Sequence, residues 1–463
     1  MNAEQDTVAA PGEAAVPPPP EVPSERRWGL SGWIPTLVGA AVLGILLGRF
    51  LLAGGGSSAP PASPATDRST EAKVASLQTR LAAVPDDPGA LTDLGVAYLA
   101  RAKETADPAW YVRAEEALDR STALAPDQVR TLTAQGLLAL ARHDFAKALG
   151  LGSRAHELDP QAADPLGVVF DARVELGQYP EAAAAAQDMV DRRPSLASLA
   201  RVSYIRELTG DHAGARAAMT QAATAGNGSS ADVAYVQTLI GDLRLASGEL
   251  DAADAAYVKA LETEAGNGGA EVGRARVAAA RGDLAAAAAR LEPVVISQPA
   301  APWATLLGDI YAALGRDGDA AVQYDLVREI DRSEQANGVI LDFDIARFEA
   351  DHIRGPGADA EAVVNQARVG LAQRPSVFAE DGLGWALRQA GRPDEALPHA
   401  RAAVRIGTGD ALLWWHLARI EADLGMADDA RRDLATAFSL NRWLSVRDLP
   451  AARALAAELG IDS

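Results

Sequence analysis

Turn-forming positions recur at a fixed interval of 34 residues, and this interval constrains the fold more than any other feature of the chain. Pro126, Pro160 and Pro194 end the stretches ALAP, ELDP and DRRP, and Thr408 and Arg442 repeat the spacing near the C-terminus. A period of this length indicates an array of supersecondary units. Each unit needs its neighbours to bury its apolar face.

Each unit has the composition of two short helices. The stretch LGWALRQAGRPDEALPHARAAVRI places Gly384 in a first helix, a glycine turn seven residues later, and Ala396 in a second helix. The same order recurs in LLGDIYAALGRDGDAAVQYDLV from Leu306 and in LIGDLRLASGELDAADAAYVKAL from Leu239. Alanine and leucine favour helices, and no alternating runs typical of strands are present. The sequence therefore predicts an all-α chain.

This pattern resembles the tetratricopeptide repeat (TPR) family, whose 34-residue helix–turn–helix unit carries small residues at fixed interior positions. The resemblance covers about ten units between residues 88 and 442. It implies a TPR-type α-solenoid over residues 71–442. Residues 443–463 are expected to form a capping helix, because the last hairpin would otherwise expose its apolar face. The fourth and eighth units depart from the pattern, which leaves open a division of the solenoid into subdomains.

Small residues stand at matching positions of the two helices. Without side chains beyond Cβ, the helices can approach to the short end of the usual range of about 8–10 Å. A glycine within a helix costs about 1 kcal/mol relative to alanine, so its recurrence implies a packing reason. Tyr257 and Tyr324 are expected to fill spaces between hairpins. The predicted close-contact residues are Gly95, Gly136, Gly241, Gly308 and Gly384 on first helices and Ala148, Ala182, Ala253, Ala287, Ala320, Ala396 and Ala430 on second helices.

The N-terminal region has a different composition. Residues 1–28 are rich in proline and are predicted to be a disordered tail, because they cannot bury enough apolar surface. Residues 29–53 contain WIPTLVGAAVLGILLGRFLL, which is long enough to cross a bilayer, and are predicted to form a transmembrane helix. Residues 54–70 read as a flexible linker. A cleaved signal peptide is the alternative, but the long preceding region and the missing A-x-A site favour an anchor.

The predicted anchor gives an expected location. A long C-terminal domain crosses the membrane largely regardless of loop charge. We therefore expect a bacterial-type inner (plasma) membrane protein with a cytoplasmic N-terminus and an extracytoplasmic TPR domain. Ala40, Gly44 and Gly48 lie four residues apart, a spacing that lets two membrane helices touch and form a homodimer. Glycine is also common in membrane helices, so the spacing fits both interpretations.

Charge and composition exclude several functions. The formal charge of −20 argues against nucleic acid as a partner, because phosphate binding needs a basic face. The absence of cysteine excludes disulfides and thiol catalysis. Six histidines occupy different units without the spacing of metal ligands. No catalytic constellation is found, so the prediction is a protein without enzymatic activity, cofactor or metal.

The resemblance implies a binding surface. In TPR proteins the first helices line a concave groove that binds peptides or extended segments. Two tryptophans and two arginines stand on adjacent first helices near the C-terminus, and both residue types are enriched at interface hot spots. The residues predicted to line the partner-binding groove are Tyr235, Asp242, Asp309, Asp381, Trp385, Arg388, Trp415, His416 and Arg419.

These features together predict a membrane-anchored TPR scaffold. It would bind a protein or peptide partner through its groove, in assembly of an envelope complex. The alternative is an accessory or regulatory subunit of another membrane enzyme complex, for example in cytochrome maturation. This second assignment is analogy at the level of fold and layout. An enzyme has the least support.

Overall fold

The computed structural model describes residues 69–225, 229–340, 343–352 and 358–461. The predicted tail, transmembrane helix and nearly all of the linker lie outside the described residues, and so do Ala40, Gly44 and Gly48. Among the helices that the structure describes, none has the length and apolar character needed to cross a membrane.

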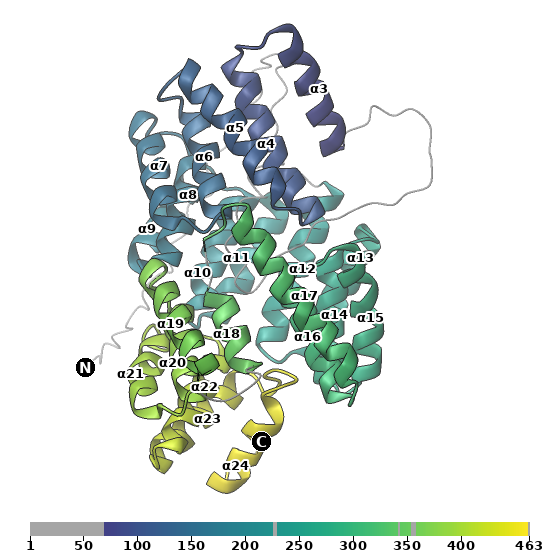
Figure 1. Ribbon diagram of the computed structural model, residues 1–463, viewed down its shortest axis with the longest axis vertical. Helices are drawn as coiled ribbons and strands as arrows, with labels where there is room; N and C mark the ends of the chain where they lie inside the picture. Colours follow the sequence, from purple (N-terminus) through teal and green to yellow (C-terminus); the bar gives the residue numbers. More distant parts are fainter. Residues whose placement is uncertain (1–68, 226–228, 341–342, 353–357, 462–463) are drawn as a thin grey trace, which may run out of the picture. The chain divides into compact units, whose positions relative to one another are not determined.

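The described residues form 22 α-helices and no strand (Figure 1). The prediction of an all-α solenoid is confirmed for this part of the chain. Helix α3 (Thr70–Ala83) precedes the array and α24 (Leu449–Leu459) follows it. The helices between them form ten consecutive pairs: α4 (Pro88–Thr105) with α5 (Ala109–Leu124), α6 (Val129–Ala141) with α7 (Phe145–Leu158), α8 (Asp164–Glu175) with α9 (Tyr179–Arg192), α10 (Leu196–Leu208) with α11 (His212–Ala225), α12 (Ser230–Ala246) with α13 (Leu250–Thr263), α14 (Gly268–Ala280) with α15 (Leu284–Ser297), α16 (Ala301–Ala313) with α17 (Asp317–Ala336), α18 (Phe343–Asp351) with α19 (Ala358–Gln373), α20 (Val377–Gln389) with α21 (Pro393–Ala403), and α22 (Ala411–Asp423) with α23 (Ala427–Leu440).

The turn inside a pair contains a left-handed residue in nine of the ten pairs, and the turn between α18 and α19 lies almost entirely outside the described residues. Gly248 (φ 72°) follows α12 and Gly391 (φ 75°) follows α20. Glycine adopts this conformation without steric cost and ends a helix by satisfying its last carbonyl groups. His143 takes the same conformation (φ 60°) after α6, where the sequence has no glycine. The recurring glycines of the sequence therefore set where most of the first helices stop.

The helical glycines make room for large side chains rather than for alanines. A Cβ atom on Gly241 would lie 2.5 Å from the ring of Tyr257, and one on Gly308 would lie 2.5 Å from the ring of Tyr324. Real Cβ atoms essentially never show such distances. Each ring also reaches the next hairpin. A Cβ atom on Gly273 would lie 2.3 Å from the Tyr257 ring, and the centroid of the Tyr324 ring lies 4.2 Å from that of His352. The expectation that these two tyrosines fill spaces between hairpins is therefore confirmed, and each ring fills the space beside the glycine of its own hairpin as well.

The other glycines show two further arrangements. Gly384 approaches a helix backbone, as its Cβ would lie 3.2 Å from the amide nitrogen of Ala400. Gly136 faces the next hairpin instead, where a Cβ would lie 2.7 Å from Val168. The alanines named from the sequence on the second helices are all buried, with exposed fractions of 0–2%: Ala148, Ala182, Ala253, Ala287, Ala320, Ala396 and Ala430.

Hairpins far apart in the sequence also contact one another. The Ile340 N–H donates to the carbonyl oxygen of Arg142 at 2.9 Å. The Val377 N–H donates to the hydroxyl of Tyr179 at 2.7 Å. These bonds join the segment before α18 and the start of α20 to the turns that follow α6 and α8.

Two further ties continue this set. The buried side chains of Arg374 and Glu175 form an ion pair, and Asn441 donates from Nδ2 to the carbonyl oxygen of Leu245 at 2.9 Å. We call these four contacts the coil-to-coil seam: Ile340–Arg142, Val377–Tyr179, Arg374–Glu175 and Asn441–Leu245. The described residues 69–461 fall within one compact unit.

Candidate ligand cavity

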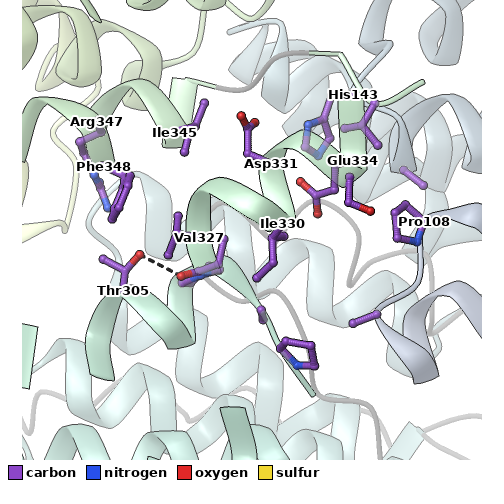
Figure 2. A pocket seen from close by; sticks show the side chains of 18 of the residues that line it. Pro108, His143, Thr305, Val327, Ile330, Asp331, Glu334, Ile345, Arg347 and Phe348 are labelled. Carbon is purple, nitrogen blue, oxygen red and sulfur yellow. Dashed lines mark hydrogen bonds between the residues drawn. The ribbon is translucent and has the colours of Figure 1, made fainter. Parts of the chain in front are cut away.

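The array contains a partly open cavity of about 590 Å³ (Figure 2). Its walls come from α4, α5 and α6, from α16, α17 and α18, and from α22 with the segment before α24. This volume lies within the range of about 300–1,000 Å³ that is usual for ligand sites in proteins. Because the walls are remote in sequence, the cavity exists only when the whole array is folded.

One wall is a stripe along α17. Val327, Ile330, Asp331 and Glu334 line the cavity from this helix (Figure 2). They occupy positions i, i+3, i+4 and i+7, which fall on one face of an α-helix. The stripe therefore presents two apolar and two acidic side chains side by side, and we call it the α17 stripe.

The wall from α4 and α5 is mostly apolar. Leu99 and Ala102 line the cavity together with Lys103 and Tyr111. Burial lowers the pKa of Lys103 to about 8, against the opposing effect of nearby carboxylates. Burial raises the pKa of the Tyr111 phenol, and the charge of Glu334 raises it further. The phenol therefore stays protonated at neutral pH.

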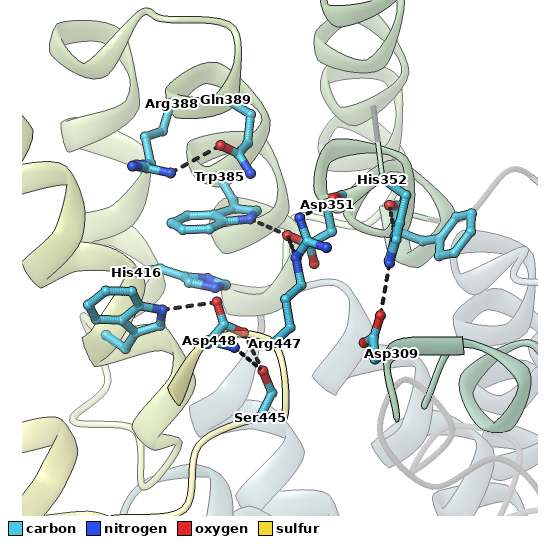
Figure 3. A network of polar contacts seen from close by, with 12 residues as sticks. Asp309, Asp351, His352, Trp385, Arg388, Gln389, His416, Ser445, Arg447 and Asp448 are labelled. Carbon is cyan, nitrogen blue, oxygen red and sulfur yellow. Dashed lines mark hydrogen bonds and ion pairs between the residues drawn. The ribbon is translucent and has the colours of Figure 1, made fainter. Parts of the chain in front are cut away.

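The opposite wall carries buried polar groups (Figure 3). Asp351 and Asp448 line the cavity, and each accepts a hydrogen bond from a tryptophan. The Trp385 Nε1–H donates to Asp351 at 2.7 Å, and the Trp415 Nε1–H donates to Asp448 at 3.1 Å. Ser445 donates to the second oxygen of Asp448 at 2.5 Å. These bonds tie α18 to α20, and α22 to the segment before α24.

His416 stands at the centre of this network. Its Nδ1 lies 2.8 Å from Asp381, and its ring stacks on Trp385 with 4.0 Å between centroids. Burial lowers the pKa of His416, but the charges of Asp381, Asp448 and Asp351 act in the opposite direction and prevail, so its pKa lies above the ordinary value. A protonated imidazole donates through Nδ1 to Asp381, which stabilises the contact between α20 and α22.

The structure corrects the predicted groove. Trp415 is 1% exposed, Trp385 4% and Asp381 1%, so these side chains contact other hairpins instead of an open surface. Large aromatic side chains gain most from burial, and their N–H groups then need an acceptor. Here that acceptor is an aspartate.

The structure brings part of the remaining predicted groove residues together, since the Arg388 guanidinium lies over the Trp385 ring, 4.8 Å from its centroid. Asp309 and His416 line the cavity. Arg388 and Arg419 both pair with Asp423, at 2.7 Å each. Tyr235 packs against the core formed by α8–α12. The nine residues therefore do not form one surface.

Sequence reasoning missed most of the cavity. Lys103, Tyr111 and the α17 stripe lack any repeat signature. The spacing of the two aspartate–tryptophan pairs is one signal in the sequence that could have revealed them. Asp351 and Trp385 are 34 residues apart, and Trp415 and Asp448 are 33 residues apart. Pairs separated by one repeat are candidates for contacts between neighbouring units.

Asp242, another predicted groove residue, is a buried carboxyl group of α12 that accepts a hydrogen bond from the Tyr257 hydroxyl at 2.7 Å. Burial raises its pKa to about 7, although the charge of Arg276 and the bond from Tyr257 lower it. The folded state therefore binds this proton more tightly than the unfolded chain. The resulting stability is complete at low pH and is lost as the pH rises through about 7.

Replacement of Asp242 by asparagine tests this dependence. Between pH 5 and pH 8 the variant should lose less stability than the parent, by on the order of 2–4 kcal/mol, because the amide side chain cannot ionise. Urea denaturation at the two pH values gives the difference. Tyr257→Phe retains the carboxyl group and should retain the pH dependence. Identical pH dependence in D242N and the parent would contradict the account.

A model of the tetratricopeptide repeat family matches residues 170–230, 272–333 and 382–439. No curated protein sequence matches the chain.

Several solved structures are similar to the chain. One is TTC0263, a TPR protein of Thermus thermophilus, at 21% identity and a TM-score of 0.37 over 41% of this chain and 98% of that chain. Another is the APC/C hetero-tetramer Cut9–Hcn1, at 12% identity and a TM-score of 0.38 over 84% of this chain and 93% of that chain. The human IFIT1 dimer with m7Gppp-AAAA matches at 12% identity and a TM-score of 0.44 over 72% of this chain and 76% of that chain.

The segments matched by the family model fall on α8–α11, α14–α17 and α20–α23, where the structure has consecutive helical hairpins. The 34-residue period and the paired helices continue outside these segments. The chain therefore contains tetratricopeptide repeats in these three segments.

Proposed function

We propose that this chain is a membrane-anchored scaffold that binds an extended segment of a protein partner inside the cavity. The observation that supports this most is the α17 stripe, which offers both apolar surface and hydrogen-bond acceptors within one cavity. Val327 and Ile330 would pack against apolar side chains of the partner. The carboxylates of Asp331 and Glu334 would accept hydrogen bonds from its N–H groups, which charged acceptors bind more strongly than neutral ones.

Site-specific photo-crosslinking of the full-length chain in its membrane tests the cavity. A benzophenone amino acid at Ile330 should crosslink one defined partner protein. At Val322, which is on the same helix but 62% exposed and outside the cavity lining, it should not. Ile330→Lys should then reduce recovery of that partner about tenfold, with Val322→Lys as the matched control. Equal crosslinking at both positions, or unchanged recovery with a folded Ile330→Lys variant, would reject the assignment.

The anchor is supported by the sequence of residues 29–53. We assign the N-terminus to the cytoplasm and the repeats to the outer side of an inner membrane. Ala40, Gly44 and Gly48 are assigned to a homodimer contact within the bilayer. Protease protection in sealed inverted vesicles tests the topology. Residues 69–461 should be protected in these vesicles, and digestion of the repeats from outside would reverse the assignment.

A further inference from the structure

Lys103 lies on the cavity wall without an ion-pair partner among the described residues, although the charges of Glu104 and Glu264 act on it. It lies near the end of α4 among Leu99, Ala102 and Ala106, which also line the cavity. Among the described residues, no carboxylate oxygen lies within 4.0 Å of its Nζ. An ammonium group in apolar surroundings without a directly paired counter-charge is unstable, so the group loses its proton more readily than an exposed lysine does. The pKa of about 8 agrees with this environment.

An amine of this kind is a nucleophile. The neutral form attacks carbonyl carbon, and a lysine desolvated in an apolar pocket supplies that form near neutral pH. Tyr111 lines the same cavity from the start of α5. Its hydroxyl stays protonated and is thus a hydrogen-bond donor on the same wall. The cavity combines a nucleophile, a donor and room for a small organic molecule.

We propose that Lys103 binds a small apolar aldehyde as a reversible imine. The Nζ atom adds to the carbonyl carbon to give a carbinolamine. The carbonyl oxygen then leaves as water with the two hydrogens of the amine, and a C=N bond remains. No electron donor or acceptor is needed. The inference requires only the cavity, so failure of partner crosslinking at Ile330 would leave it standing.

The chain provides its own controls. It contains four lysines, at positions 73, 103, 147 and 259. Lys147 and Lys259 are exposed on second helices. Any general reactivity of lysine would appear at these two positions, so selective reaction at Lys103 must come from its surroundings.

Reductive trapping tests the proposal. The full-length protein is incubated at pH 7 with benzaldehyde and sodium cyanoborohydride, and the modified lysines are quantified by peptide mass spectrometry. An ordinary lysine with a pKa near 10.4 has only about 1 part in 2,500 neutral at pH 7, against about 1 in 10 for a pKa of 8. Since nucleophilicity also falls with pKa, we expect Lys103 to react about 10–100 times faster than Lys147 and Lys259.

Two further measurements separate the environment from the residue. In urea-unfolded protein all four lysines should react at similar rates. Tyr111→Phe should slow trapping at Lys103 severalfold and leave Lys147 unchanged. Trapping of Lys103 at or below the rate of Lys147 and Lys259 in the folded chain would overturn the proposal. So would a preference for Lys103 that persists after unfolding.

Discussion

Replacing Tyr257 by alanine is expected to lower the free energy of unfolding by about 4 kcal/mol. The side chain is fully buried, and its ring lies beside two glycines, Gly241 and Gly273, of successive hairpins. Removal of a large buried aromatic ring leaves a cavity that the backbone can fill only in part, at a cost of about 3–5 kcal/mol. The Asp242 carboxyl group would also lose the hydroxyl that donates to it.

Urea denaturation followed by circular dichroism measures this loss. Tyr257→Phe separates packing from hydrogen bonding, because it retains the ring and should cost only about 1–2 kcal/mol. A loss below about 2 kcal/mol in the alanine variant would mean that the two glycines are not held apart by this ring.

Replacing Arg201 by methionine is expected to be equally severe, at about 3–5 kcal/mol. Arg201 and Asp171 form an ion pair whose side chains are only 1% and 2% exposed. The guanidinium donates from Nε at 3.0 Å and from the second nitrogen at 2.5 Å. Burial already raises the pKa of Asp171 to about 6, against the opposing charge of Arg201. Without the arginine, an uncompensated buried carboxylate remains.

The double variant Arg201→Met/Asp171→Leu provides the control. Removing both charges together should restore most of the lost stability, because a buried ion pair can often be replaced by apolar side chains at little cost. The two substitutions should therefore be strongly non-additive when thermal unfolding is measured at pH 7. Additive effects, or a loss under about 1 kcal/mol in the single arginine variant, would contradict the buried-pair account.

Much of the local fold could be predicted from the sequence because it depends on short-range chemistry. Gly248 and Gly391 mark the turns, and the 34-residue period marks the pairs of helices. The sequence did not predict which group each small residue packs against. Gly241 and Gly384 have the same place in the pattern, yet one meets a tyrosine ring and the other a helix backbone. The side chain four residues after the paired alanine decides between these outcomes.

The candidate site was much less predictable, for two physical reasons. Trp385 and Trp415 have the composition of an interface hot spot, but an aspartate one repeat away satisfies each N–H group and allows burial. Lys103 and Glu334 are brought to one cavity by the superhelical path of the whole array. That path is set by small rotations between successive hairpins, which a repeat pattern does not encode.

The coil-to-coil seam has a consequence for how this protein can change in evolution. Its ties join residues separated by 196, 198 and 199 positions, and the ties advance along the chain by about one or two repeats, by nearly the same amount on both sides. An open solenoid can gain or lose a unit anywhere along its length. In this chain, deleting one hairpin between α10 and α17 would bring every later loop against the wrong turn, so Arg374 would no longer meet Glu175. The number of units in that middle segment is therefore fixed, and variation in length is confined to the two ends of the array.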